Sequence, residues 1–330
     1  MIKNYLYFFI YDNTESDLCK LESKYIFNQK EKNKLLLSDK KIEPSISAFI
    51  QKRMDILLQA EDYSTLIEKI KNEKICVDNF KVEYIVLDGD TTEYSKRLEK
   101  LKDIGYSIDG TPEYYKPAIT YALCYYKGVW YFGTLIKNNL EWQKHKQKPF
   151  SYSNSININI AKALVNIAAQ TNTKRKILDA CCGVGTIMLE ACFAGNTIEG
   201  CDINWKVCRQ ARTNLSHFNY TANVYRSDIK DIANLYDAAI IDLPYNIFSN
   251  PGDDTTQHII ESTTKIADRI IIVSITDIRE IITNAGLIVS DYCTVKKSGK
   301  AKFARSIWLC EKKESDLGGS LSMELIDEKD

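Results

Sequence analysis

The chain has 330 residues, 45% of them hydrophobic, which exceeds the usual size of one domain and suffices for two cores. We therefore expect two domains. The formal net charge is zero, but the residues from Glu314 onward hold six acids against one lysine. The chain up to Lys313 consequently has 43 basic and 38 acidic residues, an excess that permits a nucleic-acid partner without demonstrating one.

Several classes of protein are disfavoured by the same composition. The ten cysteines show no C-x-x-C spacing and no targeting segment precedes them, which predicts reduced thiols in a cytoplasmic protein. The histidines lack metal-ligand spacing, so we expect no metal. The apolar run Tyr5 to Tyr11 is too short to span a bilayer, so we expect no membrane partner. The oligomeric state stays open.

Residues 1–148 mix short apolar runs with charged, helix-like stretches, which predicts an α+β domain. We expect strands at Tyr5–Tyr11, Tyr84–Leu87 and Ile119–Tyr126, and a helix at Ser45–Leu58. A polar, basic stretch then leads to Pro149 and marks the domain boundary. Its basic residues would contact phosphates or remain solvated, and both interpretations stay open for the set Lys144, His145, Lys146 and Lys148.

Residues 149–313 alternate apolar strands with amphipathic helices, which predicts an α/β domain with a mostly parallel, seven-stranded sheet covered on both faces. A helix comes first, with one apolar face from Ile156 to Ile167. The last two strands should form an antiparallel hairpin. Residues 314–330 have too little apolar surface to order and are expected to form an acidic, disordered tail. The strands are expected near Lys176–Asp179, Thr197–Cys201, Ala222–Arg226, Ala238–Asp242, Arg269–Val273, Leu287–Thr294 and Phe303–Cys310.

The first of these strands breaks into a glycine turn, Ile177 to Gly185, with the sequence ILDACCGVG. Because Gly183 and Gly185 carry no Cβ, a bulky cofactor can approach the backbone there. A dinucleotide-binding G-x-G-x-x-G motif would need a third glycine where this chain has Met188, which disfavours NAD.

Carboxylates follow the next two strands. Asp202 can accept both ribose hydroxyls of a bound nucleoside, and the adjacent Ile203 offers an apolar face to adenine. Asp228 can accept the adenine amino group. Each acid could instead cap a helix, and for Asp228 the two interpretations have equal weight.

Asp242-Leu243-Pro244-Tyr245 ends the fourth strand and predicts the reacting site. An exocyclic base amine is a poor nucleophile because its lone pair is delocalised into the ring, so acceptors must hold it and take its proton. Asp242 and a backbone carbonyl turned outward by Pro244 would be those acceptors, and Tyr245 would stack on the flipped base. A plain strand-ending Asp-x-Pro turn is the alternative.

Residues 148–310 resemble the class I S-adenosylmethionine-dependent methyltransferases, and among them the tRNA guanosine N2-methyltransferases that carry an RNA-binding THUMP domain. Upstream, Phe80–Leu87, Ile104–Gly110 and Val129–Gly133 resemble a divergent THUMP domain behind a ferredoxin-like unit. The residues that carry the methyltransferase resemblance are Lys148 to Ser151, Ala161, Leu164, Asn166, Asp179, Cys182, Gly183, Gly185, Thr186, Glu190, Asp202, Asn214, Asp242, Pro244 and Tyr245.

The resemblance implies a Rossmann-like fold, S-adenosylmethionine as cofactor and RNA, of the tRNA class, as partner. It places Asp179, Cys182, Gly183, Gly185 and Thr186 around the cofactor, with Asp202 on the ribose, Ile203 beside the adenine and Asp228 on its amine. Asp242, Pro244 and Tyr245 would hold guanine N2. Two alternatives stay open: a DNA methyltransferase acting on adenine N6 or cytosine N4, and a non-catalytic RNA-binding protein with this fold.

Overall fold

The computed structural model describes residues 4–152, 155–244, 253–296 and 303–312. The chain divides into two compact units. The first comprises Met1–Ile10 and Glu31–Leu140, and the second comprises Tyr11–Lys30 and Glu141–Asp330. The segment Tyr11–Lys30 thus packs with the second unit, which no local pattern in the sequence indicates. None of the helices in the described ranges combines the length and apolar character needed to cross a membrane.

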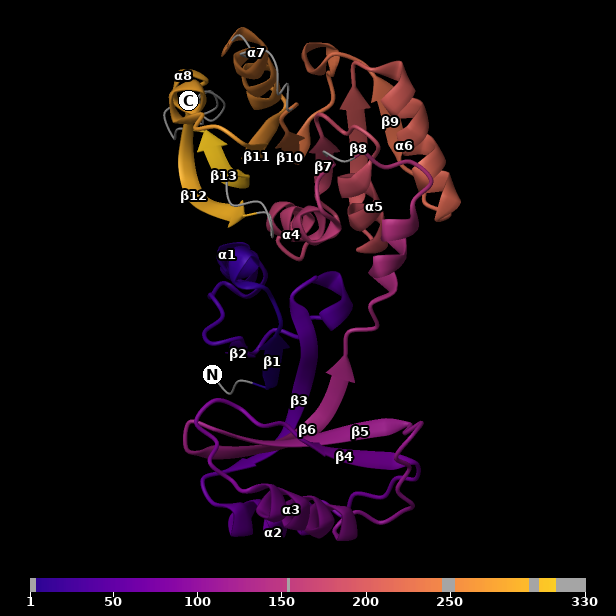
Figure 1. Ribbon diagram of the computed structural model, residues 1–330, viewed down its shortest axis with the longest axis vertical. Coiled ribbons are helices and arrows are strands. Elements are labelled where there is room, and N and C mark those ends of the chain that lie inside the picture. The colour runs from indigo at the N-terminus through magenta and orange to yellow at the C-terminus, as the bar shows by residue number, and fades with distance from the viewer. Residues whose placement is uncertain (1–3, 153–154, 245–252, 297–302, 313–330) are drawn as a thin grey trace, which may run out of the picture. The chain divides into compact units, whose positions relative to one another are not determined.

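The first unit is built on one mixed sheet with two helices on one face (Figure 1). The helices α2 (Tyr63–Asn72) and α3 (Tyr94–Tyr106) bury Leu66, Ile70 and Ile104 in a core that also holds Phe132. Strands β4 and β5 are parallel, and the other paired strands are antiparallel. In sheet order, the strands are β2 (Leu35–Ser38), β1 (Tyr5–Phe9), β3 (Ile50–Ala60), β6 (Val129–Lys137), β5 (Ile119–Tyr126) and β4 (Phe80–Tyr84).

Two predictions for this unit are wrong. The helix expected at Ser45–Leu58 is instead strand β3, preceded by the short 3-10 helix η2 (Pro44–Ile46). The spacing of its apolar residues fits a helix, but pairing with β1 on one side and β6 on the other decides the conformation. The strand expected at Tyr84–Leu87 shares only Tyr84 with β4. The α+β character of the unit is as predicted.

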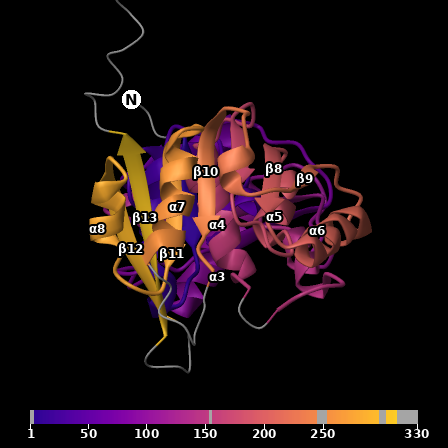
Figure 2. The ribbon, with the colours of Figure 1, turned by 90° about the horizontal axis from the view of Figure 1, so that it is seen from above.

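The second unit contains a seven-stranded sheet within the described residues (Figures 1 and 2). The predicted strands are confirmed to within two residues at each end, and so is the antiparallel hairpin of the last two. The sheet is mixed, because β13 runs antiparallel to both neighbours whereas the other four neighbouring pairs are parallel. In sheet order, the strands are β12 (Leu287–Lys296), β13 (Ala304–Lys312), β11 (Ala267–Ser274), β10 (Tyr236–Asp242), β7 (Lys176–Asp179), β8 (Thr197–Asp202) and β9 (Asn223–Arg226).

The direction in which strands are added reverses between β7 and β10. From β7 the chain proceeds to β8 and β9 on one side, and then returns to β10 and β11 on the other. In open α/β sheets such a reversal leaves a crevice at the carboxyl ends of the strands, where ligands bind. The helices of this unit are α1 (Ser16–Phe27), α4 (Ile158–Ala169), α5 (Thr186–Phe193), α6 (Trp205–His217), α7 (Asp253–Thr264) and α8 (Arg279–Asn284), with the 3-10 helices η1 (Asn13–Glu15), η3 (Glu141–Gln147) and η4 (Ile229–Asp231).

Helix α4 is buried on nearly every side, although its sequence predicts one apolar face. It packs on β10 and β11, and α1 covers its outer side. The amide of Asn166 donates a 2.6 Å hydrogen bond to the buried Glu22 carboxylate, and Asn159 donates to Glu15 over 3.2 Å. The segment Tyr11–Lys30 therefore completes the core of the second unit, which contains the seven-stranded sheet.

Candidate cofactor and substrate site

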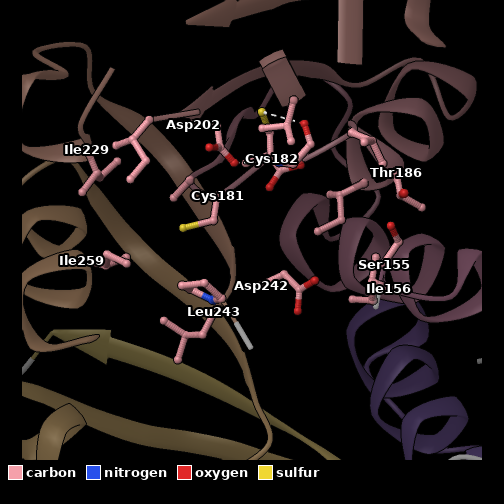
Figure 3. A pocket seen from close by; sticks show the side chains of 18 of the residues that line it. Ser155, Ile156, Cys181, Cys182, Thr186, Asp202, Ile229, Asp242, Leu243 and Ile259 are labelled. Carbon is pink, nitrogen blue, oxygen red and sulfur yellow. Dashed lines mark hydrogen bonds between the residues drawn. The ribbon is translucent and has the colours of Figure 1, made fainter. Parts of the chain in front are cut away.

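A cavity of about 560 Å³ lies at the carboxyl ends of β7 and β10, where the order of strand addition reverses. Four carboxylates reach it from four neighbouring strands: Asp179, Asp202 and Asp242 end β7, β8 and β10, and Asp228 follows β9. Figure 3 shows Asp202, Cys182, Thr186 and Asp242 around this space. Predicted site residues that line the cavity are Asp179, Cys182, Gly183, Thr186, Asp202, Ile203, Asp228, Asp242 and Pro244.

Asp179 is a buried acid whose carboxylate has no hydrogen-bond partner among the residues that the structure describes. Its side chain is 1% exposed, and neither carboxylate oxygen is hydrogen-bonded to any described residue. Burial, and then the negative charges of Asp242 and Asp202, raise the pKa of Asp179 well above its ordinary value. The hydroxyl of Thr186, on the same cavity, is likewise buried and unpaired within the described chain. These orphaned groups fit a ligand that brings hydrogen-bond donors and positive charge.

The glycine turn after β7 is held by backbone bonds. The Cys182 N–H donates to the Cys201 carbonyl over 3.0 Å, and the Gly185 N–H donates to the Cys182 carbonyl over 2.7 Å. Gly183 has a φ of +50°, and a Cβ added there would meet open space, so its bare surface faces the cavity. The turn therefore offers backbone at the point where a ligand approaches.

Gly185 does not line the cavity. Its φ is +79°, and a Cβ there would lie 3.2 Å from the Cβ of Ala211 on α6. The residue precedes the first turn of α5 and lets α6 approach closely. In this structure Gly185 thus serves the packing behind the pocket, whereas Gly183 faces the ligand side.

Asp202 does not cap a helix. The cap of α6 is Asn204, whose side chain accepts from the Lys206 N–H over 3.0 Å. Asp202 instead accepts from Gly183 N–H at Oδ2 over 3.1 Å and from Asn204 N–H at Oδ1 over 2.8 Å. This excludes the capping interpretation and leaves a carboxylate fixed in the cavity wall beside Ile203, which is 72% exposed.

Asp228 caps a short helix, as one interpretation of the sequence holds, and it also lines the cavity. Its Oδ1 accepts from the Lys230 N–H over 3.0 Å, which caps η4, while the residue also lines the cavity. The same oxygen pairs with Nε2 of His258 over 3.1 Å. Partial burial raises the pKa of Asp228, but the bonds from Lys230 and His258 outweigh it and bring this pKa below its ordinary value. Asp228 is therefore a carboxylate at neutral pH.

The Asp-Leu-Pro segment leaves β10 at the edge of the cavity. Leu243 is buried and its N–H donates to the Val273 carbonyl over 3.1 Å, which extends the sheet by one bond. Asp242 is partly buried and Pro244 exposed. In Figure 3 the Asp242 carboxylate lies between Leu243 and Ser155. Tyr245, predicted to stack on the base, lies outside the described residues.

The two cysteines of the turn have thiols that are difficult to ionise. Burial, and then the neighbouring carboxylates, raise the pKa of both the Cys181 and the Cys182 thiols above the ordinary value. A neutral thiol is a poor nucleophile. The structure therefore gives covalent catalysis through Cys181 or Cys182 no support.

Part of the cavity wall comes from the segment before α4, through Tyr152, Ser155 and Ile156. Asn214 on α6 holds this segment in place: it accepts from the Phe150 N–H and donates to the Phe150 and Val184 carbonyls, each over 2.9 Å. One side chain thus links the segment to the cofactor turn. Sequence reasoning noted Phe150 and Asn214 but not their contact.

His145 is not part of a phosphate-binding cluster. It is fully buried, with Nδ1 2.7 Å from the Glu190 carboxylate and Nε2 3.1 Å from the Tyr220 hydroxyl. Lys162 lies 3.5 Å from the other oxygen of Glu190 and is also buried. The basic stretch around residue 145 therefore contributes its histidine to the core of the second unit.

Residues 145–271 match the UPF0020 family model, described as an RMKL-like methyltransferase domain. This match begins at η3 and covers the glycine turn and all four carboxylates. It confirms the resemblance to class I S-adenosylmethionine-dependent methyltransferases, and S-adenosylmethionine is the cofactor of such a domain.

Two curated relatives match part of the chain. A tRNA (guanine(10)-N2)-dimethyltransferase of Methanothermobacter thermautotrophicus is 31% identical over 37% of this chain and 37% of its own length. One of the same name from Methanocaldococcus jannaschii is 31% identical over 27% of this chain and 28% of its own. The aligned stretches thus span between about a quarter and little more than a third of the length of these relatives. Among solved structures, TrmN from Thermus thermophilus is 13% identical with a TM-score of 0.47, covering 94% of this chain and 99% of that one.

Proposed function

We propose that the protein transfers a methyl group from S-adenosylmethionine to the exocyclic N2 amine of a guanosine in tRNA. One observation carries the proposal: a single cavity holds both Asp179, a buried acid that is unpaired within the described part of the chain, and, at its edge, Asp242 and Pro244. This cavity lies in the stretch that matches a methyltransferase domain, and two proteins named tRNA guanine N2-dimethyltransferases are similar to part of the chain.

Each carboxylate of the cavity is assigned to a different part of the cofactor or to the substrate. Asp179 and the hydroxyl of Thr186 would receive the ammonium group of the methionine portion, because their oxygens are buried and unpaired in the described chain. Asp202, already oriented by the N–H groups of Gly183 and Asn204, would accept the ribose hydroxyls. Asp228 would accept the adenine amine. The cofactor supplies an electrophilic methyl group on a sulfonium, and no metal or covalent enzyme adduct is required.

Asp242 would hold the guanine amine and receive its proton as the nitrogen–carbon bond forms. A carboxylate near a developing positive charge on nitrogen stabilises the transition state more than the neutral amine. Positioning of donor and acceptor within one pocket supplies much of the rate, about 7 to 11 kcal/mol in favourable cases. The first unit would bind the RNA through its phosphates and shape, and would deliver one unpaired nucleotide.

The test compares alanine variants at two carboxylates of this unit, Asp242 in the cavity and Asp268 on the exposed surface. Asp242→Ala should reduce methyl transfer to unmodified tRNA transcript by at least about a hundredfold, while calorimetry should give an S-adenosylhomocysteine affinity within a few-fold of wild type. Asp268→Ala, which removes an exposed acid of the same unit, should leave both quantities unchanged. Full activity of Asp242→Ala would refute its assignment.

Binding measurements on the wild-type protein separate the rival functions. Competition between tRNA and duplex DNA for the protein should favour tRNA strongly. Preferential binding of duplex DNA, with methyl transfer to adenine N6 or cytosine N4, would replace the proposal with a DNA amino-methyltransferase. Failure of the wild-type protein to bind S-adenosylhomocysteine in calorimetry would leave a non-catalytic RNA-binding protein.

A further inference from the structure

We propose that His258 is a positioning residue that fixes Asp228 for recognition of the adenine amino group, and so sets the preference of the cofactor pocket for adenine over hypoxanthine. This inference rests on the proposed function, since it assumes that the cavity takes an adenosine cofactor. Neither the sequence motifs nor the family match assigns His258 a role.

Helix α7 forms one wall of the cavity. Thr255, His258 and Ile259 line it together, and their spacing of three and four residues puts them on one helical face. On the remainder of the helix, Ile260 and Thr263 are fully buried and anchor it to the core of the unit. The His258 side chain is 45% exposed, so it borders the cavity without being part of the packed core.

The hydrogen bonds of Asp228 show what His258 contributes. Oδ1 accepts from the Lys230 N–H and pairs with His258 Nε2, whereas Oδ2 accepts no hydrogen bond from any described residue. With Oδ1 held from two sides, the carboxylate plane is fixed and Oδ2 remains for a ligand. Nε2 must carry a proton to donate to this carboxylate, which it does both in one neutral tautomer and in the imidazolium form.

This arrangement should favour adenine over hypoxanthine, because the two bases differ in the group that they present to Asp228. The amino group of adenine donates a hydrogen bond to a carboxylate oxygen, whereas hypoxanthine presents a carbonyl oxygen at the same position. Two acceptors facing each other in a partly buried site leave both unpaired, which disfavours hypoxanthine. An Asp228 held only by the Lys230 N–H could turn away from this carbonyl, so loss of His258 should weaken discrimination.

Two substitutions separate the hydrogen bond from the shape of the side chain. His258→Gln keeps an N–H donor at a similar reach, and His258→Leu removes the donor while keeping apolar bulk. Because His258 is nearly half exposed, neither change opens a buried cavity. Circular dichroism and thermal unfolding would verify that both variants are folded.

The measurement is calorimetric binding of S-adenosylhomocysteine and S-inosylhomocysteine to the full-length protein. Wild type should prefer the adenosine compound by at least about tenfold. His258→Leu should weaken the affinity for S-adenosylhomocysteine about three- to tenfold and change the affinity for S-inosylhomocysteine by less than about twofold. The affinities of His258→Gln for both compounds should stay within about twofold of the wild-type values. In turnover, His258→Leu should raise KM for S-adenosylmethionine and leave kcat unchanged.

The outcomes distinguish this inference from the proposed function. If wild type binds neither compound, the adenosine-cofactor assignment itself fails. If wild type binds and prefers the adenosine compound, but His258→Leu retains the wild-type preference or loses affinity for both compounds equally, the role of His258 is refuted. Asp228→Asn completes a double-mutant cycle with His258→Leu. The double variant should lose no more of the preference for the adenosine compound than Asp228→Asn loses alone.

Discussion

The backbone N–H of Gly183 donates a 3.1 Å hydrogen bond to Oδ2 of Asp202, which joins the turn after β7 to the end of β8. The Cys182 N–H reinforces this link by donating to the Cys201 carbonyl over 3.0 Å. The ligand-facing glycine and the acid assigned to the ribose are therefore fixed relative to each other before any ligand arrives. Such preorganisation avoids an ordering cost at binding.

Gly200 makes the close approach of these two segments possible. A Cβ at this position would lie 2.5 Å from Met188 Sδ and 2.9 Å from Cys182 Cβ. We expect Gly200→Ala to destabilise the second unit by about 1 to 3 kcal/mol and to weaken binding of S-adenosylhomocysteine, as measured by thermal unfolding and calorimetry. Gly105→Ala, in a helix of the first unit with open space around it, should be neutral or slightly stabilising. Equal effects of the two changes would contradict this packing.

We expect the carboxylate of Asp179 to lower the stability of the ligand-free protein and to strengthen binding of the cofactor. Burial opposes ionisation of Asp179 in the ligand-free protein, so Asp179→Asn should unfold at a higher temperature than wild type at pH 7. Binding of S-adenosylhomocysteine should weaken about ten- to a hundredfold, because the ammonium group loses a charged acceptor. The exposed acid Asp268, changed to Asn, should alter neither value. Unchanged affinity in Asp179→Asn would remove this carboxylate from the cofactor site.

The same acid predicts a pH dependence. Because the pKa of Asp179 is raised in the folded protein, the folded state binds more protons than the unfolded state at pH values between the ordinary pKa and the raised one. The contribution of Asp179 to stability therefore falls as pH rises through that window. Denaturant unfolding across this pH range should show a gap between Asp179→Asn and wild type that widens with pH. A constant gap would contradict the burial of an uncompensated carboxylate.

Glu190 pairs with two buried groups, His145 over 2.7 Å and Lys162 over 3.5 Å. Glu190→Leu should destabilise the second unit by about 3 to 5 kcal/mol, because it leaves the buried Lys162 without its carboxylate partner. Adding Lys162→Met should recover part of that loss. Denaturant unfolding measures both. As a control, Asp268→Ala breaks an exposed ion pair with Lys312 and should cost no more than about 1 kcal/mol; a similar cost for Glu190→Leu would show that the cluster carries little energy.

Helix α1 should stabilise the unit that holds the cavity. Ile26 on α1 is fully buried, so Ile26→Ala should lower the stability of the second unit by about 2 to 5 kcal/mol. The relevant unfolding transition is the one that S-adenosylhomocysteine shifts to higher temperature. Lys20→Ala, on the exposed side of the same helix, should change it by less than about 0.5 kcal/mol. If Ile26→Ala left the ligand-sensitive transition in place, α1 would not belong to this unit.

The sequence identifies the second sheet because its strands are short apolar runs bounded by turns, and buried parallel strands need nothing else locally. It fails at Ser45–Leu58 because the charges and spacing there fit a helix, whereas the outcome depends on pairing with β1 and β6, which are distant in sequence. It also cannot show that α1 covers α4. That contact joins Glu22 to Asn166, which are 144 residues apart in the sequence.

The residues of the site likewise include some that the sequence identifies and some that only tertiary packing reveals. Asp179, Asp202, Asp228 and Asp242 can be found because each stands at or just after the end of a strand, and strand ends converge at one edge of a sheet. His258 cannot, since it lies inside a polar helix and reaches Asp228 only through tertiary packing. Gly185 looks like a ligand-facing glycine in the motif, yet the adjacent α6 accounts for it.

Mass spectrometry of nucleosides tests the proposed methyl transfer to guanine N2 of tRNA. Purified protein is incubated with isotope-labelled S-adenosylmethionine and unmodified tRNA transcript, and the RNA is digested. The proposed function predicts labelled N2-methylguanosine or N2,N2-dimethylguanosine with wild type, and neither with Asp242→Ala. Label in another nucleoside, or none in RNA from a protein that binds S-adenosylhomocysteine, would contradict it.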